Sequence, residues 1–225
     1  MMRAFSLAEA REWLQATLAG ARTDAGELWF DGVSTDTRLV GDGQLFVALR
    51  GERFDGHEFL GQALTQGAVA AVVDTEVTDV AIPQLVVSDT VQALADLASA
   101  NRSGSAARLV AITGSSGKTT VREMTGAILA GMGPTLVTEG NLNNHIGVPL
   151  TLFRLTPDHQ FGAIELGASG LGEIAHTVSI TRPQVAILTN AGQAHLEGFG
   201  SYQNIVLAKG EIIDGVPADG AVVLN

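Results

Sequence analysis

The residues from Gly114 to Thr120 have the types and the setting of a loop that binds phosphate groups. An apolar run at 109–113 leads into this loop, and a helical pattern at 121–130 follows it. In such a strand–loop–helix, backbone N–H groups and the helix N-terminus bind phosphate oxygens, a lysine supplies positive charge and a threonine hydroxyl binds Mg²⁺. We therefore predict a nucleotide-phosphate loop formed by Gly114, Ser115, Ser116, Gly117, Lys118, Thr119 and Thr120.

The loop departs from the strict nucleotide-binding pattern at one position. That pattern has a glycine five residues before Gly117, where this chain has Ile112, and the glycine stands at Gly114 instead. The alternative is an ordinary glycine-rich turn with a solvated Lys118. The apolar run before the loop, the helical pattern after it and the adjacent Lys118 and Thr119 favour nucleotide binding.

Further candidates for chemistry lie downstream, near the ends of later apolar runs. Glu165 lies at the end of the run at 162–166, and His195 follows the run at 185–189. A carboxylate beside a phosphate loop holds Mg²⁺ directly or through water, although pairing of Glu165 with a nearby basic residue is the alternative. For His195 a ligand role and a structural role are equally compatible with its position. Lys209, in the helical stretch 202–213, reads on its own as a solvated surface lysine.

The segment 140–149 is too polar and too rich in turn residues for a core strand. Loops of this kind often carry function. Its asparagines, among them Asn141 and Asn144, are better candidates for binding a polar ligand than His145, because an amide both donates and accepts hydrogen bonds.

The elements that must position these residues form an α/β pattern. Short apolar runs at 109–113, 135–138, 162–166, 185–189 and 221–224 alternate with helical segments, which predicts a mainly parallel, doubly wound sheet with ligands at the carboxyl ends of its strands. Before them we expect a helix from Ser6 to Gly20, carrying Leu14 and Leu18 on one face, and a small α/β domain with strands at 27–30, 44–49, 68–73 and 84–87 and helices at 57–66 and 90–100. We place the change of domain near Val87, giving domains 1–87 and 88–225.

Composition excludes several classes of function. The chain has 225 residues, 46% of them hydrophobic, a formal net charge of −11 and no cysteine. This charge opposes binding to nucleic acid or to an anionic membrane, and the absence of cysteine excludes disulfides and thiolate sites. The apolar runs are too short to span a membrane, and Glu9 and Glu12 stand where a signal peptide would be apolar, so we expect a cytoplasmic protein without a membrane segment.

The combination of motifs resembles the Mur ligases of bacterial cell-wall synthesis. The resemblance rests on Thr113-Gly-Ser-Ser-Gly-Lys-Thr119, Gly140-Asn-Leu-Asn-Asn144, Ile164-Glu-Leu-Gly167 and Ala194-His-Leu-Glu197. In the N-terminal part, Ser34-Thr-Asp-Thr-Arg38, Leu45-Phe-Val-Ala-Leu49 and Gly51-Glu-Arg-Phe-Asp-Gly-His57 also fit. The Ser-Ser form of the loop and the Asn-rich segment resemble the branch that joins D-alanyl-D-alanine to UDP-N-acetylmuramoyl-tripeptide.

This resemblance implies an ATP- and Mg²⁺-dependent ligase with these two substrates, and we expect a monomer. It implies that Lys118 binds the β- and γ-phosphates of ATP, that Thr119 and Glu165 bind Mg²⁺, and that His195 binds a second Mg²⁺ together with Lys209 in the form of a carbamate. Asn144 belongs to the nucleotide side of the site. The residues implied for the UDP-linked substrate are Ser34, Thr35, Asp36, Arg38, Arg50, Arg53, His57 and Asn141.

The family has three domains, for the UDP-sugar, for ATP and for the incoming amine. We expect this chain to end inside the second domain and to lack the third domain. The resemblance therefore does not imply that this chain is active by itself. The alternatives are a related ligase with other substrates, a non-catalytic module that binds nucleotide or UDP-sugar, and a general P-loop kinase. A folate-type ligase typically has Gly-Lys-Gly-Ser in the loop, whereas this chain has Gly117-Lys-Thr-Thr120.

Overall fold

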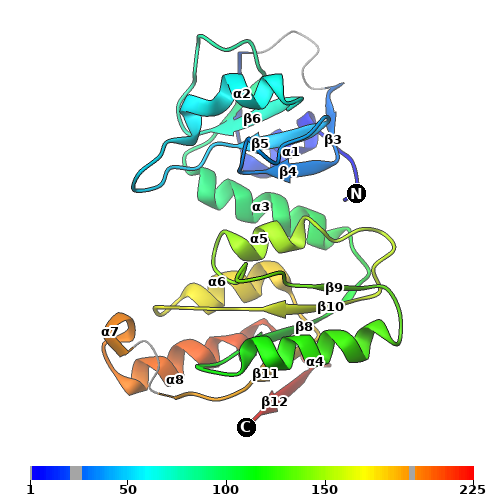
Figure 1. The fold of residues 1–225 in the computed structure, drawn as a ribbon, viewed down its shortest axis with the longest axis vertical. Helices are drawn as coiled ribbons and strands as arrows, with labels where there is room; N and C mark the ends of the chain where they lie inside the picture. Colours follow the sequence, from blue (N-terminus) through cyan, green and yellow to red (C-terminus); the bar gives the residue numbers. More distant parts are fainter. Residues whose placement is uncertain (1, 21–26, 193–195) are drawn as a thin grey trace. The chain divides into compact units, whose positions relative to one another are not determined.

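The computed structural model describes residues 2–20, 27–192 and 196–225 (Figure 1). The chain divides into two compact units, Met1–Asn101 and Arg102–Asn225. This division falls near the end of helix α3 (Thr90–Ser103), whereas the sequence places the change of domain before that helix. None of the helices in the described ranges has the length and apolar character needed to cross a membrane.

The first unit contains a mixed sheet of five strands in the order β2-β7-β6-β5-β4. Strands β4 (Gly32–Ser34), β5 (Gln44–Val47), β6 (Ala70–Val73) and β7 (Gln84–Val86) pair in parallel, and β2 (Thr17–Ala19) pairs antiparallel with β7. A separate antiparallel pair joins β1 (Phe5–Ser6) to β3 (Trp29–Phe30). The short 3-10 helix η2 (Gly56–Phe59) leads into α2 (Leu60–Thr65) between β5 and β6.

The core of this unit follows from the alternation of side chains along its strands. Phe46 and Ala48 from the β5 segment share a buried cluster with Ala71 and Val73 of β6, because side chains two residues apart point to the same face of a sheet. Leu60 of α2 belongs to the same cluster and is fully buried. Burial of this apolar surface positions η2 and the loop before it at the end of the sheet.

The first helix begins as predicted but ends early. Helix α1 (Leu7–Leu14) starts at a capping box, in which the Ser6 side chain accepts a hydrogen bond from the Glu9 backbone N–H and the Glu9 carboxylate accepts one from that of Ser6. Gln15 then adopts a left-handed conformation with φ of 50°. The predicted continuation to Gly20 is wrong, because Leu18 pairs with Leu85 of β7 as part of β2.

The second unit contains a parallel sheet of five strands in the order β12-β11-β8-β10-β9. Its strands are β8 (Arg108–Thr113), β9 (Thr135–Val137), β10 (Phe161–Glu165), β11 (Val185–Leu188) and β12 (Ala221–Leu224). The connecting helices are α4 (Lys118–Ala130), α5 (Gly147–Leu152), α6 (Glu173–Thr181), α7 (Leu196–Phe199) and α8 (Tyr202–Gly210), the last followed by η3 (Glu211–Gly215). The predicted α/β class and the parallel sheet are confirmed.

The order of these strands creates a crevice between β8 and β10. The chain leaves β8 over β10 to reach β9, and it leaves β10 over β8 to reach β11. Since parallel crossovers are right-handed, the helices after β8 and after β10 lie on opposite faces of the sheet. The carboxyl ends of two such neighbouring strands are where ligands bind in open α/β sheets.

Candidate functional site

The loop between β8 and α4 has a backbone that requires its glycines. Gly114 has φ of 149° and Gly117, which precedes the first residue of α4, has φ of 76°. A Cβ atom added at Gly114 would lie 2.0 Å from the Thr189 hydroxyl oxygen. The glycine displaced from the strict pattern is therefore needed here, because the loop approaches the end of β11 too closely for a side chain.

Residues after β11 hold this loop in place. The Thr189 hydroxyl donates to the carbonyl oxygen of Ser116 at 2.7 Å, and the Asn190 side chain accepts from the backbone N–H of Ser116 at 3.1 Å. The Ser115 hydroxyl bonds to both backbone groups of Gly192 at 2.9 Å. Sequence reasoning missed Thr189 and Asn190, although their place after a strand of the parallel sheet is the signal that identifies them.

Lys118 and Thr119 occupy the first turn of α4 beside the loop. The Lys118 ammonium donates to the carbonyl oxygen of Gly114 at 2.9 Å, so this side chain folds back over the loop. The Thr119 hydroxyl donates to Glu165 Oε2 at 3.1 Å across the β8–β10 crevice. Thr120 is exposed in the same turn. The structure thus brings together the predicted phosphate-binding residues and Glu165.

Glu165 is a buried carboxylate at the end of β10, with 2% of its surface exposed. Its Oε1 accepts from the Asn143 side chain at 2.8 Å, and its Oε2 also accepts from Arg122 Nη1 at 3.2 Å. Its backbone N–H donates to the Thr138 hydroxyl at 3.0 Å. Glu165 therefore has a basic partner as well as a place beside Thr119.

Arg122 is a site residue that sequence reasoning missed, whereas Asn143 is one of the asparagines of segment 140–149 that the sequence offers for binding a polar ligand. Arg122 is 3% exposed, one turn after Lys118 on α4, and also donates to the carbonyl oxygen of Gly140 at 3.0 Å. Of the same asparagines, the sequence assigns Asn141 to the UDP-linked substrate and Asn144 to the nucleotide side. Asn141 is exposed, and the Asn144 side chain accepts from the backbone N–H of Gly147 at 2.8 Å, at the start of α5.

Lys209 is buried, contrary to the surface position that its place in the sequence suggests. It is 2% exposed, donates to the carbonyl oxygen of Ala168 at 3.3 Å and lies 5.2 Å from the centre of the Phe199 ring. Burial, helped by the nearby positive charge of Lys118, lowers the pKa of Lys209 to about 8. The chain has two lysines, and both lie in this region.

The residues around the crevice fit a magnesium ion that is bound mainly through a nucleotide. Mg²⁺ is usually held by one or two carboxylates together with substrate phosphates and water. Glu165 and Thr119 supply one carboxylate and one hydroxyl within hydrogen-bond distance of each other. Within the described ranges, no three His, Asp or Glu side chains form a metal-binding group of their own. His195, the other predicted ligand, lies outside the described residues.

The first unit has a separate cavity of about 550 Å³. Three of the residues predicted for the UDP-linked substrate line it, namely Thr35, Asp36 and Arg38. Phe46, Phe54 and Phe59 give it apolar walls. The Arg38 guanidinium hydrogen-bonds to Asp36 and lowers the pKa of this carboxyl to about 2, so the cavity has a charged pair on one side.

The other predicted substrate residues of the first unit lie outside the lining of this cavity. Ser34 is buried, and its hydroxyl donates to the carbonyl oxygen of Asp36 at 3.0 Å, which shapes the cavity wall from behind. Arg53 is exposed in the loop between β5 and η2. Arg50 and His57 bond to Asp55 and Asp74 instead.

Two family models match the chain. The Mur ligase middle domain matches residues 112–225, and the catalytic domain of the Mur ligase family matches residues 30–102. The first match contains the whole phosphate loop, Glu165 and Lys209, and the second contains the residues that line the cavity of the first unit.

Curated relatives extend over the whole chain. The UDP-N-acetylmuramoyl-tripeptide--D-alanyl-D-alanine ligase of Escherichia coli is 50% identical over 224 residues, covering 100% of this chain and 48% of the relative. The ligase of the same name from Haemophilus influenzae is 48% identical, covering 94% of this chain and 46% of the relative. The chain therefore spans about half the length of the curated relatives it matches.

Solved structures agree with these relatives. A crystal structure of MurF from Acinetobacter baumannii has a TM-score of 0.92 and 39% identity, covering 99% of this chain and 49% of that one. MurF ligase from Thermotoga maritima, solved in complex with ADP, has a TM-score of 0.80 and 35% identity, covering 86% of this chain and 45% of that one. The phosphate loop, the crevice and these matches agree, and the chain belongs to the Mur ligase family.

Proposed function

We propose that this chain carries the UDP-substrate and ATP sites of an amide ligase that joins D-alanyl-D-alanine to UDP-N-acetylmuramoyl-tripeptide. The observation that carries the proposal is the 50% identity, over the whole chain, to a ligase of that name. The site supports it, because a phosphate loop faces a buried carboxylate at a position where such sheets bind nucleotides.

In this proposal the second unit binds ATP and activates a carboxylate. The loop N–H groups and Lys118 bind the β- and γ-phosphates, with Asn144 nearby. Thr119 and Glu165 hold Mg²⁺, and His195 and a carbamate of Lys209 hold a second ion. When bound, Mg²⁺ neutralises phosphate charge. The ADP complex of the Thermotoga maritima relative supports the nucleotide part of the proposal.

The reaction requires activation because a carboxylate is a poor acyl donor. A carboxylate oxygen of the tripeptide attacks the γ-phosphorus, the bond to the β-phosphate oxygen breaks, and an acyl phosphate and ADP result. The amine of D-alanyl-D-alanine then attacks the acyl carbon, loses a proton and expels inorganic phosphate. Both reactants of the first step are anions, so the charge of Lys118 offsets their repulsion and the loop aligns them.

The first unit binds the UDP-linked substrate in this proposal, with Thr35, Asp36 and Arg38 at the cavity and Ser34 behind its wall. Arg53, exposed in the same unit, also contributes to this substrate, and Asn141, an exposed residue of the second unit, keeps its predicted role in substrate binding. The domains are 1–87 for this substrate and 88–225 for ATP, in a cytoplasmic, monomeric enzyme. A third domain supplies the site for D-alanyl-D-alanine.

Phosphate release tests the proposal on this chain and, where the gene encodes a longer protein, on that protein. ATP with UDP-N-acetylmuramoyl-tripeptide and D-alanyl-D-alanine should release phosphate in the complete ligase. Replacement of the tripeptide substrate by the UDP-linked dipeptide, or of D-alanyl-D-alanine by a single amino acid, should abolish the release. Faster turnover with a replacement would assign the chain to another branch.

Lys118→Ala tests the phosphate loop directly. We expect Mg-ADP binding to weaken at least about tenfold, because a charge-assisted contact to phosphate is lost. Arg108→Ala, which removes a cation exposed in β8, is the matched control and should leave binding unchanged. Unaltered ADP binding in Lys118→Ala would contradict the proposed role of the loop.

A further inference from the structure

The loop between β5 and η2 forms part of the cavity wall in the first unit. Phe54 of this loop and Gly56, the first residue of η2, line the cavity together with Asp36 and Arg38. The loop is a tight hairpin, in which the Gly51 N–H donates to the carbonyl oxygen of Phe54 at 2.9 Å and the Gly56 N–H to that of Leu49 at 2.8 Å. Whatever fixes this hairpin therefore fixes one side of the cavity.

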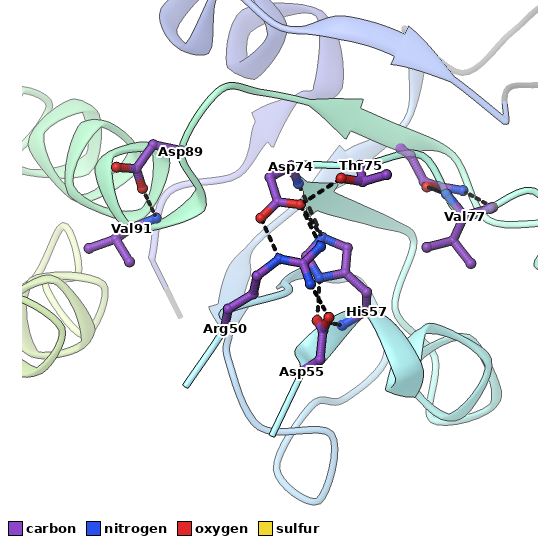
Figure 2. Close-up of polar contacts among 9 residues, drawn as sticks. Arg50, Asp55, His57, Asp74, Thr75, Val77, Asp89 and Val91 are labelled. Carbon is purple, nitrogen blue, oxygen red and sulfur yellow. Dashed lines mark hydrogen bonds and ion pairs between the residues drawn. The ribbon is translucent and has the colours of Figure 1, made fainter. Parts of the chain in front are cut away.

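Four side chains form a closed polar network, which we call the Arg50 clamp: Arg50, Asp55, His57 and Asp74 (Figure 2). Arg50 donates through Nε and Nη2 to the two carboxylate oxygens of Asp74, both at 2.8 Å. Its Nη1 pairs with Asp55. The clamp thus joins the two ends of the hairpin to the residue that follows β6.

His57 completes the network by contacting both Asp55 and Asp74. Its Nδ1 lies 2.6 Å from Asp55 Oδ1, and its Nε2 accepts from the backbone N–H of Asp74 at 3.1 Å. Because Nε2 accepts, the proton of the neutral ring lies on Nδ1 and is donated to Asp55. The His57 side chain is 7% exposed, so a buried ring connects Asp55 to Asp74.

The charges of the clamp argue against direct contact with a diphosphate. Arg50 contributes one positive charge, and Asp55 and Asp74 contribute two negative charges. All three donor nitrogens of Arg50 face carboxylates. An anionic ligand would have to displace a bidentate carboxylate to reach Arg50, and the network as a whole repels it.

We propose that the Arg50 clamp positions the Phe54 and Gly56 wall of the cavity and thereby sets its affinity for the UDP-linked substrate, without touching that substrate. This proposal rests on the proposed function of the first unit. Asp74 is a positioning residue that sequence reasoning did not identify, and Arg50 and His57 act through the wall rather than as contacts to the ligand.

Asp74→Asn distinguishes a positioning role of Arg50 from direct contact with the substrate, because the two roles predict opposite changes in substrate affinity. If Arg50 binds the diphosphate, removal of the competing carboxylate charge should strengthen binding of UDP-N-acetylmuramoyl-tripeptide. If the clamp positions the wall, binding should weaken about tenfold, because the ligand must then order the hairpin. Asp74→Glu keeps the carboxylate and should recover part of the affinity. Glu76→Gln makes the same charge change on an exposed neighbour and serves as the matched control.

The measurement is calorimetric titration of the 225-residue chain with UDP-N-acetylmuramoyl-tripeptide, accompanied by hydrogen exchange of residues 50–56. Asp74→Asn should weaken this binding and speed exchange at Gly51 and Gly56, while Mg-ADP binding by the second unit stays unchanged and shows that the protein is folded. Equal or tighter substrate binding in Asp74→Asn would overturn the clamp.

The wild-type chain separates this failure from failure of the proposed function. If wild type binds neither the tripeptide substrate nor UDP but binds Mg-ADP, the proposed function of the first unit is wrong, and the role of the clamp in binding falls with it. If wild type binds the substrate and Asp74→Asn binds equally well, only the clamp is wrong.

Discussion

Glu165 is the residue on which the second unit depends most, because it is a buried anion with several defined partners. Arg122, Asn143 and Thr119 all donate to its carboxylate. A buried charge is tolerated only when it is paired and hydrogen-bonded. These contacts hold the carboxylate in one orientation at the edge of the crevice, ready to act with the phosphate loop.

Arg122→Met should destabilise the second unit by about 3 kcal/mol or more, since it leaves Glu165 charged and buried without its basic partner. Denaturant unfolding, followed by circular dichroism, measures the change in the free energy of unfolding. Arg122→Lys keeps a positive charge that can face Glu165 but loses the second guanidinium nitrogen, Nη2, which pairs with Glu123, so its loss of stability should be smaller than that of Arg122→Met. A loss below about 1 kcal/mol in Arg122→Met would show that the ion pair matters little.

Lys209→Met should raise the stability of the protein, because an amine that is buried with one long hydrogen bond is replaced by an apolar side chain of similar size. The folded-state pKa of Lys209 is lowered to about 8 from 10.5, so between these pH values the unfolded chain binds more protons. Wild-type stability should therefore gain up to about 1.4 kcal/mol per pH unit from this residue as pH rises through that window.

Unfolding midpoints measured from pH 7 to pH 11 check this. Lys209→Met should lack the rise in stability that Lys209 gives the wild type. Lys118→Met, the same substitution at the other lysine, should retain the larger part of this rise, because burial is the main cause of the lowered pKa of Lys209 and the charge of Lys118 the lesser one. An identical pH profile in wild type and Lys209→Met would contradict burial of a charged amine. If Lys209→Met is more stable as predicted, the protein keeps Lys209 at a cost to stability, as proteins do at functional sites.

At the scale of single residues, the sequence predicted groups with a local signature and missed groups defined by tertiary contacts. Lys118 and Thr119 follow from the loop pattern, and the end of an apolar strand identifies Glu165. Burial of Lys209 and the pairing of Arg122 with Glu165 depend on elements that are distant along the chain. The hydrogen bonds between Asn190 and Ser116 likewise cannot be predicted before the order of the strands is known.

Secondary-structure elements show the same division between local and distant causes. The start of α1 was predictable, because the Ser6–Glu9 capping box is a local motif. Its end was not, because residues 17–19 pair with β7, and this tertiary pairing overrides the helical spacing of Leu14 and Leu18. Strands β8 to β12 were found within a residue, since strands of parallel sheets are continuous apolar runs, and this holds even for β12, whose four residues are exposed.

Ser6→Ala should lower the free energy of unfolding by about 1 kcal/mol, because the first turn of α1 loses the acceptor for the Glu9 N–H. Urea unfolding of the first unit, followed by tryptophan fluorescence, measures this loss. Ser169→Ala is a control at an exposed serine of the second unit and should have little effect. Equal stability of Ser6→Ala and wild type would mean that packing alone fixes the start of the helix.

The two units of the whole molecule offer different ligand sites. The first has a cavity with apolar walls and a charged pair, and the second has a phosphate loop beside a buried carboxylate. Against a net charge of −11, local positive groups such as Lys118 are needed wherever phosphates bind. The division of labour proposed for the chain follows from these two sites.

Calorimetric titration of this chain with UDP-N-acetylmuramoyl-tripeptide tests the account most directly. It is carried out in Mg²⁺ with a non-hydrolysable ATP analogue, and the UDP-linked dipeptide and free UDP are the comparison ligands. We predict that the tripeptide substrate binds more tightly than either comparison ligand. Absence of binding by all three to a folded sample, or tighter binding of the dipeptide, would contradict the proposed substrate.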